Sequence, residues 1–206
     1  MSRCLHFLLF LLLFLILKTG YAQLGLESSF LSPAGDFSYV KKPTVAFTLT
    51  LKGGSIDDRY RCGFSIGYCN FKSTQDTIPT TTIQTGGLGN FVLPGYFVYQ
   101  SYQVASFSFT NDFKILKDAN FSPTVGLDLV FYGIAYSDTY YTETLVQASE
   151  TGNTDWSAGI LPQVGIQYVY SSWFLLTANI GRNLSFGSAA PMGFWKTSIG
   201  IAYYLR

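Results

Sequence analysis

The final stretch of the chain, Gly193 to Arg206, constrains the fold more than any other part of the sequence. Alternate residues divide it into two faces. One face is apolar apart from Thr197 and consists of Trp195, Ile199, Ile201, Tyr203 and Leu205. The other is smaller and more polar and consists of Phe194, Lys196, Ser198, Gly200, Ala202 and Tyr204. This division, with aromatic residues near both ends, is typical of a transmembrane β-strand, and such a strand needs partners on both edges because lipid cannot satisfy its backbone groups.

Seven further segments show the same alternation, at residues 24–32, 44–51, 59–72, 96–117, 123–132, 156–168 and 174–186. The connections alternate as well. Short turns lie at Gly53, Lys117 and Ser171, and mostly longer loops at Pro33–Pro43, Ser73–Gly95, Thr142–Asp155 and Gly187–Pro191. Short turns at one end and longer loops at the other are typical of bacterial outer-membrane barrels, whose termini lie on the periplasmic side. We therefore predict an all-β fold: a closed, antiparallel, up-and-down transmembrane β-barrel of about eight strands.

The N-terminal segment has the pattern of a secretory signal peptide. Arg3 supplies a positive charge, Phe7–Leu17 is apolar, and Gly20-Tyr21-Ala22 places small residues before a cut at Gln23. The apolar run is too short to be interpreted first as a membrane anchor, although an uncleaved anchor is the alternative. We predict a signal peptide at residues 1–22 and an outer-membrane barrel at residues 23–206. The near-balanced net charge of +1 gives no indication of a nucleic-acid partner.

The signal peptide, the alternating strands and the aromatic terminal strand Trp195–Leu205 together resemble the small eight-stranded outer-membrane barrels of the OmpX and OmpA types, and comparable small barrels of Bacteroidota. The resemblance covers essentially all of residues 23–206 and is one of architecture. It implies a Gram-negative outer-membrane location. One difference is the C-terminus: such barrels commonly end on an aromatic residue, whereas this chain ends in Leu205-Arg206.

Catalysis is disfavoured by the loss of the only histidine, His6, with the signal peptide. Known outer-membrane barrel enzymes use a histidine, which is also the usual acid or base near neutral pH, but an unusual Ser-Lys or carboxylate-only site is not eliminated. Cys62 and Cys69 are seven residues apart in one expected strand and face opposite sides, so they cannot form a disulfide with each other. We predict no enzymatic activity, no catalytic residue, no cofactor and no metal.

Several charged residues fall on the faces expected to line the barrel lumen: Glu27, Arg61, Asp128 and Lys196, with Asp112 and Lys114 nearer the periplasmic end. An eight-stranded barrel is just wide enough for its side chains to fill it, so buried charges there should be paired. Asp128 and Lys196 are expected at similar distances from the periplasmic end of the barrel, so we predict that they form an ion pair across the lumen. The alternative is an ion path or gate.

Arg182 is the exception on the outward apolar face of its strand, near the expected extracellular end. There it could contact lipopolysaccharide phosphates, or it could be an interfacial arginine without a specific partner. The outward aromatic residues are interpreted as girdles at the two membrane interfaces: Tyr60, Tyr68, Trp156, Tyr168, Trp173, Trp195 and Tyr203.

The leading hypothesis is a non-enzymatic outer-membrane protein that displays surface loops for adhesion, structural or envelope interactions. Outer-membrane lipids and lipopolysaccharide are expected partners, as are other envelope proteins through the 73–95 loop. Three alternatives remain: a small porin-like channel or transport-related protein, a barrel subunit of an envelope secretion system, and a soluble ligand-binding barrel. The last predicts an apolar interior, whereas the smaller face here is rich in Ser, Thr, Gly, Asn and Gln.

Overall fold

Strands make up almost the whole molecule. The computed structural model describes residues 22–205 except 56–57, 75–76, 87–88, 118, 143–146 and 187–191. Within these ranges it contains one short helix, α2 (Phe37–Val40), and no helix long and apolar enough to cross a membrane. The strands are β1 (Ala22–Pro33), β2 (Thr44–Gly53), β3 (Tyr60–Asn70), β4 (Thr77–Gly86), β5 (Gly89–Lys114), β6 (Phe121–Thr142), β7 (Gln147–Val169), β8 (Phe174–Phe186) and β9 (Phe194–Leu205).

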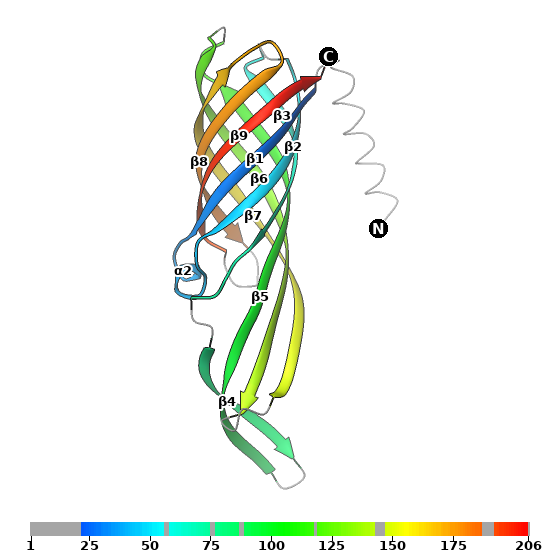
Figure 1. Ribbon diagram of the computed structural model, residues 1–206, viewed down its shortest axis with the longest axis vertical. Helices are drawn as coiled ribbons and strands as arrows, with labels where there is room; N and C mark the ends of the chain where they lie inside the picture. The colour runs from blue at the N-terminus through cyan, green and yellow to red at the C-terminus, as the bar shows by residue number, and fades with distance from the viewer. Residues whose placement is uncertain are drawn as a thin grey trace, which may run out of the picture.

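Eight of these strands close into a barrel (Figure 1). Each pairs antiparallel with its neighbours in the order β3-β2-β1-β9-β8-β7-β6-β5, and pairing of β5 with β3 completes the circle. Register partners followed once around the barrel from Phe121 lead back to β6 at Phe131, ten residues further along. Such a stagger over eight strands corresponds to a strand tilt of roughly 40°. The predicted fold class and strand number of the barrel are confirmed.

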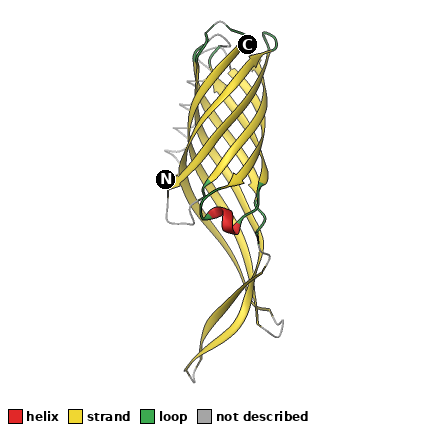
Figure 2. Ribbon diagram, turned by 90° about the vertical axis from the view of Figure 1, so that its left-hand side faces the viewer, coloured by secondary structure: helices red, strands yellow, loops and turns green. Residues whose placement is uncertain are grey.

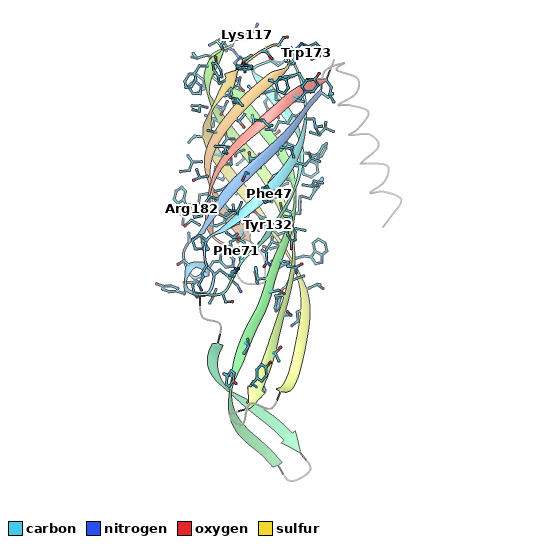
Figure 3. The ribbon with its side chains drawn as sticks, in the orientation of Figure 1. Phe47, Phe71, Lys117, Tyr132, Trp173 and Arg182 are labelled. Atoms are coloured by element: carbon cyan, nitrogen blue, oxygen red, sulfur yellow. The ribbon has the colours of Figure 1, made fainter. Side chains whose placement is uncertain are left out.

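The two ends of the barrel differ. The end that carries Ala22 and Leu205, which are register partners, is called the terminal end, and the opposite end the distal end. Lys117 and Trp173 mark short turns at the terminal end (Figure 3). The predicted signal peptide, residues 1–22, lies outside the described residues except for Ala22, which already belongs to β1. Arg206 also lies outside them.

The barrel wall is apolar on the outside, as the alternating sequence predicts. In β9 the predicted outward residues are exposed and their neighbours are buried or half-buried. All seven predicted girdle aromatics are exposed. Five lie on barrel strands, whereas Trp173 lies in the turn before β8 and Trp156 lies where the projecting part of β7 begins. On β9 they include Trp195 near the distal end and Tyr203 near the terminal end. Eight residues of a strand at this tilt span roughly 20 Å, close to the roughly 25 Å apolar band of outer-membrane barrels.

A sheet projects beyond the distal end on one side of the barrel (Figures 1 and 2). The ends of β5, β6 and β7 continue past the last partners of β3 and β8, and β4 pairs with the start of β5. The interpretation of residues 73–95 as a loop is therefore wrong: most of this segment forms the β4–β5 hairpin. The predicted loop at 142–155 is also largely strand, because β7 already begins at Gln147. In both stretches neither face of the strand is consistently apolar, so the sequence pattern does not reveal these strands.

Helix α2 lies at the distal end of the barrel, on the other side from β5 (Figure 1). It follows β1 in the connection that we predicted as a loop at residues 33–43. Its Phe37 is buried and makes an edge-on contact with Phe71, with ring centroids 5.1 Å apart, and a tilted contact with Tyr102 at 5.8 Å. The helix therefore closes the distal end of the lumen over an apolar layer.

Candidate functional site

Two ion pairs fill the terminal half of the lumen. Lys196 Nζ lies 2.5 Å from Glu27 Oε1, joining β9 to β1, and Lys52 Nζ pairs with Asp112 Oδ2, joining β2 to β5. All four side chains are largely buried, with 13–16% of their surface exposed. Buried charges are tolerated when they are paired and hydrogen-bonded, so each pair neutralises its own charges and links strands that are far apart in sequence.

Each member of the two ion pairs lies opposite a glycine on a neighbouring strand. The register partners are Glu27 with Gly200, Lys52 with Gly63, Asp112 with Gly126, and Lys196 with Gly181. A side chain at Gly63 would place its Cβ on the carbonyl oxygen of Leu51, and one at Gly126 would place it 2.9 Å from Asp112 Oδ1. The missing side chain at Gly126 therefore leaves room for the Asp112 carboxylate, and the missing side chain at Gly63 lets the backbones of β2 and β3 approach closely.

Arg61 forms the centre of a second polar network, closer to the terminal end. Its guanidinium is buried, with 3% of the residue exposed, and donates from Nη1 to Tyr204 Oη at 2.8 Å and to Gln23 Oε1 at 3.3 Å. Nη2 donates to Gln167 Oε1. The partners come from β1, β7 and β9, so one side chain on β3 crosslinks four strands. A buried cation with neutral acceptors is a structural crosslink more than a reactive group.

Asp128 does not form the ion pair that the sequence suggested. Lys196 pairs with Glu27 instead, because barrel closure places β1 and β9 side by side and the long lysine side chain spans the four residues of register between Lys196 and Gly200, the partner of Glu27. Asp128 is 4% exposed, and its Oδ2 accepts a hydrogen bond from Gln163 Nε2 at 3.2 Å. Among the described residues, no hydrogen-bond partner is found for its Oδ1.

Lys52 and Lys114 complete the charged interior of the terminal half. Lys114 is buried on the lumen side of β5, as predicted. Lys52 is a charged lumen residue that the sequence interpretation missed. Its signal was available: Lys52 continues the alternation of Thr44, Ala46, Thr48 and Thr50 on the smaller face of the second strand.

The distal half of the lumen is apolar. Its buried cluster joins nearly every strand and consists of Leu31, Phe37, Ala46, Cys69, Phe71, Val104, Val130, Tyr132, Ile134, Leu161, Met192 and Phe194. Polar atoms at this level bond to one another: Tyr132 donates to Asn183 Oδ1 at 2.7 Å, and Asn183 Nδ2 donates to the carbonyl of Met192 at 2.5 Å. Figure 3 shows Tyr132 and Phe71 in this half of the barrel.

Small cavities remain on either side of the Glu27–Lys196 pair. One, of about 50 Å³, is lined by Lys196, Asp128 and part of the apolar cluster. Another, of about 30 Å³, is lined by Glu27, Lys52 and Arg61. A cavity needs about 10–15 Å³ to hold one water molecule, so each has room for a few waters. Within the described part of the chain, no three His, Cys, Asp or Glu side chains are grouped as metal ligands.

Arg182 is separate from all of these groups, on the outer wall (Figure 3). It is exposed on β8, and its guanidinium carbon lies 5.5 Å from the centroid of the Trp195 ring on β9. Cys62 and Cys69 are both free thiols; Cys62 is exposed and Cys69 buried, in agreement with their predicted positions on opposite faces of one strand.

Comparison with known proteins supports the fold. No protein-family model matches the sequence, and no curated protein matches it at a significant level. Among solved structures, the outer membrane protein OprG from Pseudomonas aeruginosa is similar with a TM-score of 0.53 and 12% identity, over 90% of this chain and 95% of that one. A major outer membrane protein from Thermus thermophilus is similar with a TM-score of 0.50 and 10% identity, over 89% and 99% of the two chains. The chain thus has the fold of the small eight-stranded outer-membrane β-barrels.

Proposed function

We propose that the protein is a non-enzymatic integral protein of a bacterial outer membrane, exported with a cleaved signal peptide, whose barrel anchors the projecting sheet at the cell surface. The terminal end then lies in the periplasm and the distal end outside the cell, as in other barrels of this type. The observation that carries the proposal is the contrast between a filled barrel and a projection that extends beyond it.

The filled lumen argues for an anchor and against a channel. An apolar layer occupies the distal half, and ion pairs together with the Arg61 network occupy the terminal half. An ion would have to cross the apolar layer with few polar groups to replace its hydration shell, which is costly. Purified protein in planar lipid bilayers should therefore give no single-channel steps. Regular steps that disappear on substitution of Asp128 would instead favour the porin-like alternative.

The projection supplies the surface for contact. Its strand segments carry Asp138, Glu150 and Asp155 and contain no lysine or arginine, so it suits a neutral or cationic partner. β4 and the distal part of β7 are the outer strands of this sheet, and each has a register partner on one side only among the described strands. An exposed sheet edge can bind an extended segment of another protein by strand addition.

Two experiments test the anchor and the display separately. After cell lysis and a carbonate wash, the protein should remain in the membrane fraction until detergent is added, and its N-terminal residue should be Gln23. Recovery in the aqueous fraction would contradict the proposal. An epitope inserted between Gly86 and Gly89 should be detected on intact cells, whereas one inserted at Lys117 should be detected only after permeabilisation. Crosslinking from intact cells would then show whether the partner belongs to an envelope secretion system.

A further inference from the structure

The outer wall of the barrel carries a local group of polar residues. On adjacent strands β8, β9 and β1, the outward side chains include Arg182, Thr197, Ser28 and Ser32. The register places Arg182 opposite Trp195 and Trp195 opposite Ser32, while Thr197 lies opposite Phe30, one step toward the terminal end. These strands thus expose a cation and several hydroxyl groups where apolar side chains are expected.

Arg182 lies beside the distal girdle, as the register partner of Trp195, and has apolar side chains around it on its own strand. Its outward neighbours along β8 are Ile180 and Leu184, both exposed, and Phe186 is exposed still further toward the distal end. The two ion pairs among the described residues involve other side chains, and the Arg182 guanidinium stacks over the face of Trp195. A charge placed at this depth in a membrane is costly unless it meets an opposite charge. Its long side chain can reach the interface, where lipid phosphates lie.

An apolar groove lies on the same strands, closer to the terminal end than Arg182. It begins at Ile199, which is four residues along β9 from Trp195, the register partner of Arg182. It has a volume of about 540 Å³ and is lined by outward side chains of β1, β2, β8 and β9, namely Leu26, Ser28, Phe47, Leu176, Ile199 and Ile201. Ser28 is the register partner of both Phe47 and Ile199, and its small side chain leaves a depression between these two larger ones. This volume falls in the usual range of small-molecule sites, about 300–1,000 Å³.

We propose that this surface is a binding site for a phosphorylated lipid of the outer leaflet, of the lipid A class. Arg182 binds the phosphate, and Thr197 and Ser32 offer hydroxyl groups to the headgroup. An acyl chain lies in the apolar groove on the terminal side of Arg182. A guanidinium matches phosphate geometry with two parallel hydrogen bonds, and the apolar groove matches a hydrocarbon chain. The inference rests on the proposed outer-membrane location, and it adds a specific lipid to it.

Native mass spectrometry of the full mature protein in detergent tests this site, with diphosphoryl lipid A and its dephosphorylated form as probes. Arg182→Gln should weaken binding of the phosphorylated lipid about tenfold, the scale of a lost charge-assisted bidentate contact, and leave the dephosphorylated lipid unaffected. Ile199→Trp, which fills the groove, should weaken both lipids. Lys72→Gln removes an exposed cation two residues after the end of β3, and Val125→Trp enlarges a side chain on the outer face of β6; both are matched controls that should change neither.

Other outcomes would overturn the lipid site. Equal binding by wild type and Arg182→Gln would do so, as would equal loss on Lys72→Gln, which would indicate diffuse charge attraction. Loss of a copurifying membrane protein from Arg182→Gln, with lipid binding unchanged, would assign the cation to a protein carboxylate. Arg182→Lys keeps the charge and should retain part of the binding if the glutamine variant fails to fold. A folded, membrane-inserted barrel without selective lipid binding refutes the site alone, whereas recovery in the aqueous fraction refutes the outer-membrane proposal itself.

Discussion

The two halves of the lumen fill the same cross-section with opposite chemistry. The terminal half holds Glu27–Lys196, Lys52–Asp112 and the Arg61 network, with glycines opposite the paired charges. The distal half holds tightly packed aromatic and aliphatic side chains beneath α2. The difference shows that the lumen of a small barrel can be filled either by paired charges or by apolar packing. The stability of the polar half depends on each charge having its partner, and the stability of the apolar half depends on how well the side chains fit together.

The largest effect is expected from breaking a charge pair in the terminal half. Lys196→Met leaves Glu27 buried without its cation, and the free energy of unfolding should fall by about 3 kcal/mol, the lower range for removing one member of a buried ion pair. The double variant Glu27→Gln/Lys196→Met should recover most of this loss. Urea titration of the protein folded in phospholipid vesicles measures both. Equal destabilisation by the single and double variants would show that the pair contributes through packing alone.

A comparable loss is expected in the distal half for a different reason. Phe194→Ala removes a ring that packs against Phe71 and Tyr132, with centroids 6.4 and 6.3 Å away, and should cost about 3 kcal/mol through the cavity it leaves. Phe131→Ala, on the outer wall, is the matched control and should cost clearly less, because lipid can occupy the vacated space. Equal costs for the two substitutions would show that the distal half of the lumen is not close-packed.

A smaller effect is expected where a glycine opposite a paired charge lets two strands approach closely. Gly63→Ala introduces a Cβ at the carbonyl of Leu51, opposite Lys52, and should destabilise the barrel by about 1–3 kcal/mol, as for overpacked interiors. Gly152→Ala on β7 is the control, because a Cβ there meets no atom within 4 Å. The same urea titration measures both variants. If Gly63→Ala leaves the free energy of unfolding unchanged, the strands of the polar half can shift to make room for an added methyl group.

Local pattern predicted the barrel well because alternation reports which face of a strand meets an apolar environment. The phases of the strands containing Leu24, Phe47, Ile166 and Ile201 follow directly from this rule. The same rule failed for β4. Its residues 77–86 contain five threonines, which favour strands, but neither face is consistently apolar, so only pairing with β5 reveals the strand.

The sequence by itself determined that the chain is a β-barrel with an apolar outer wall, and which charged residues enter the lumen. It determined this because side-chain direction in a strand depends only on residue parity. Only the tertiary structure decided that Lys196 meets Glu27 instead of Asp128, that each paired charge faces a glycine, and that Arg182 shares a surface with Thr197 and an apolar groove. These contacts depend on the stagger between strands far apart in sequence, which is fixed when the barrel closes.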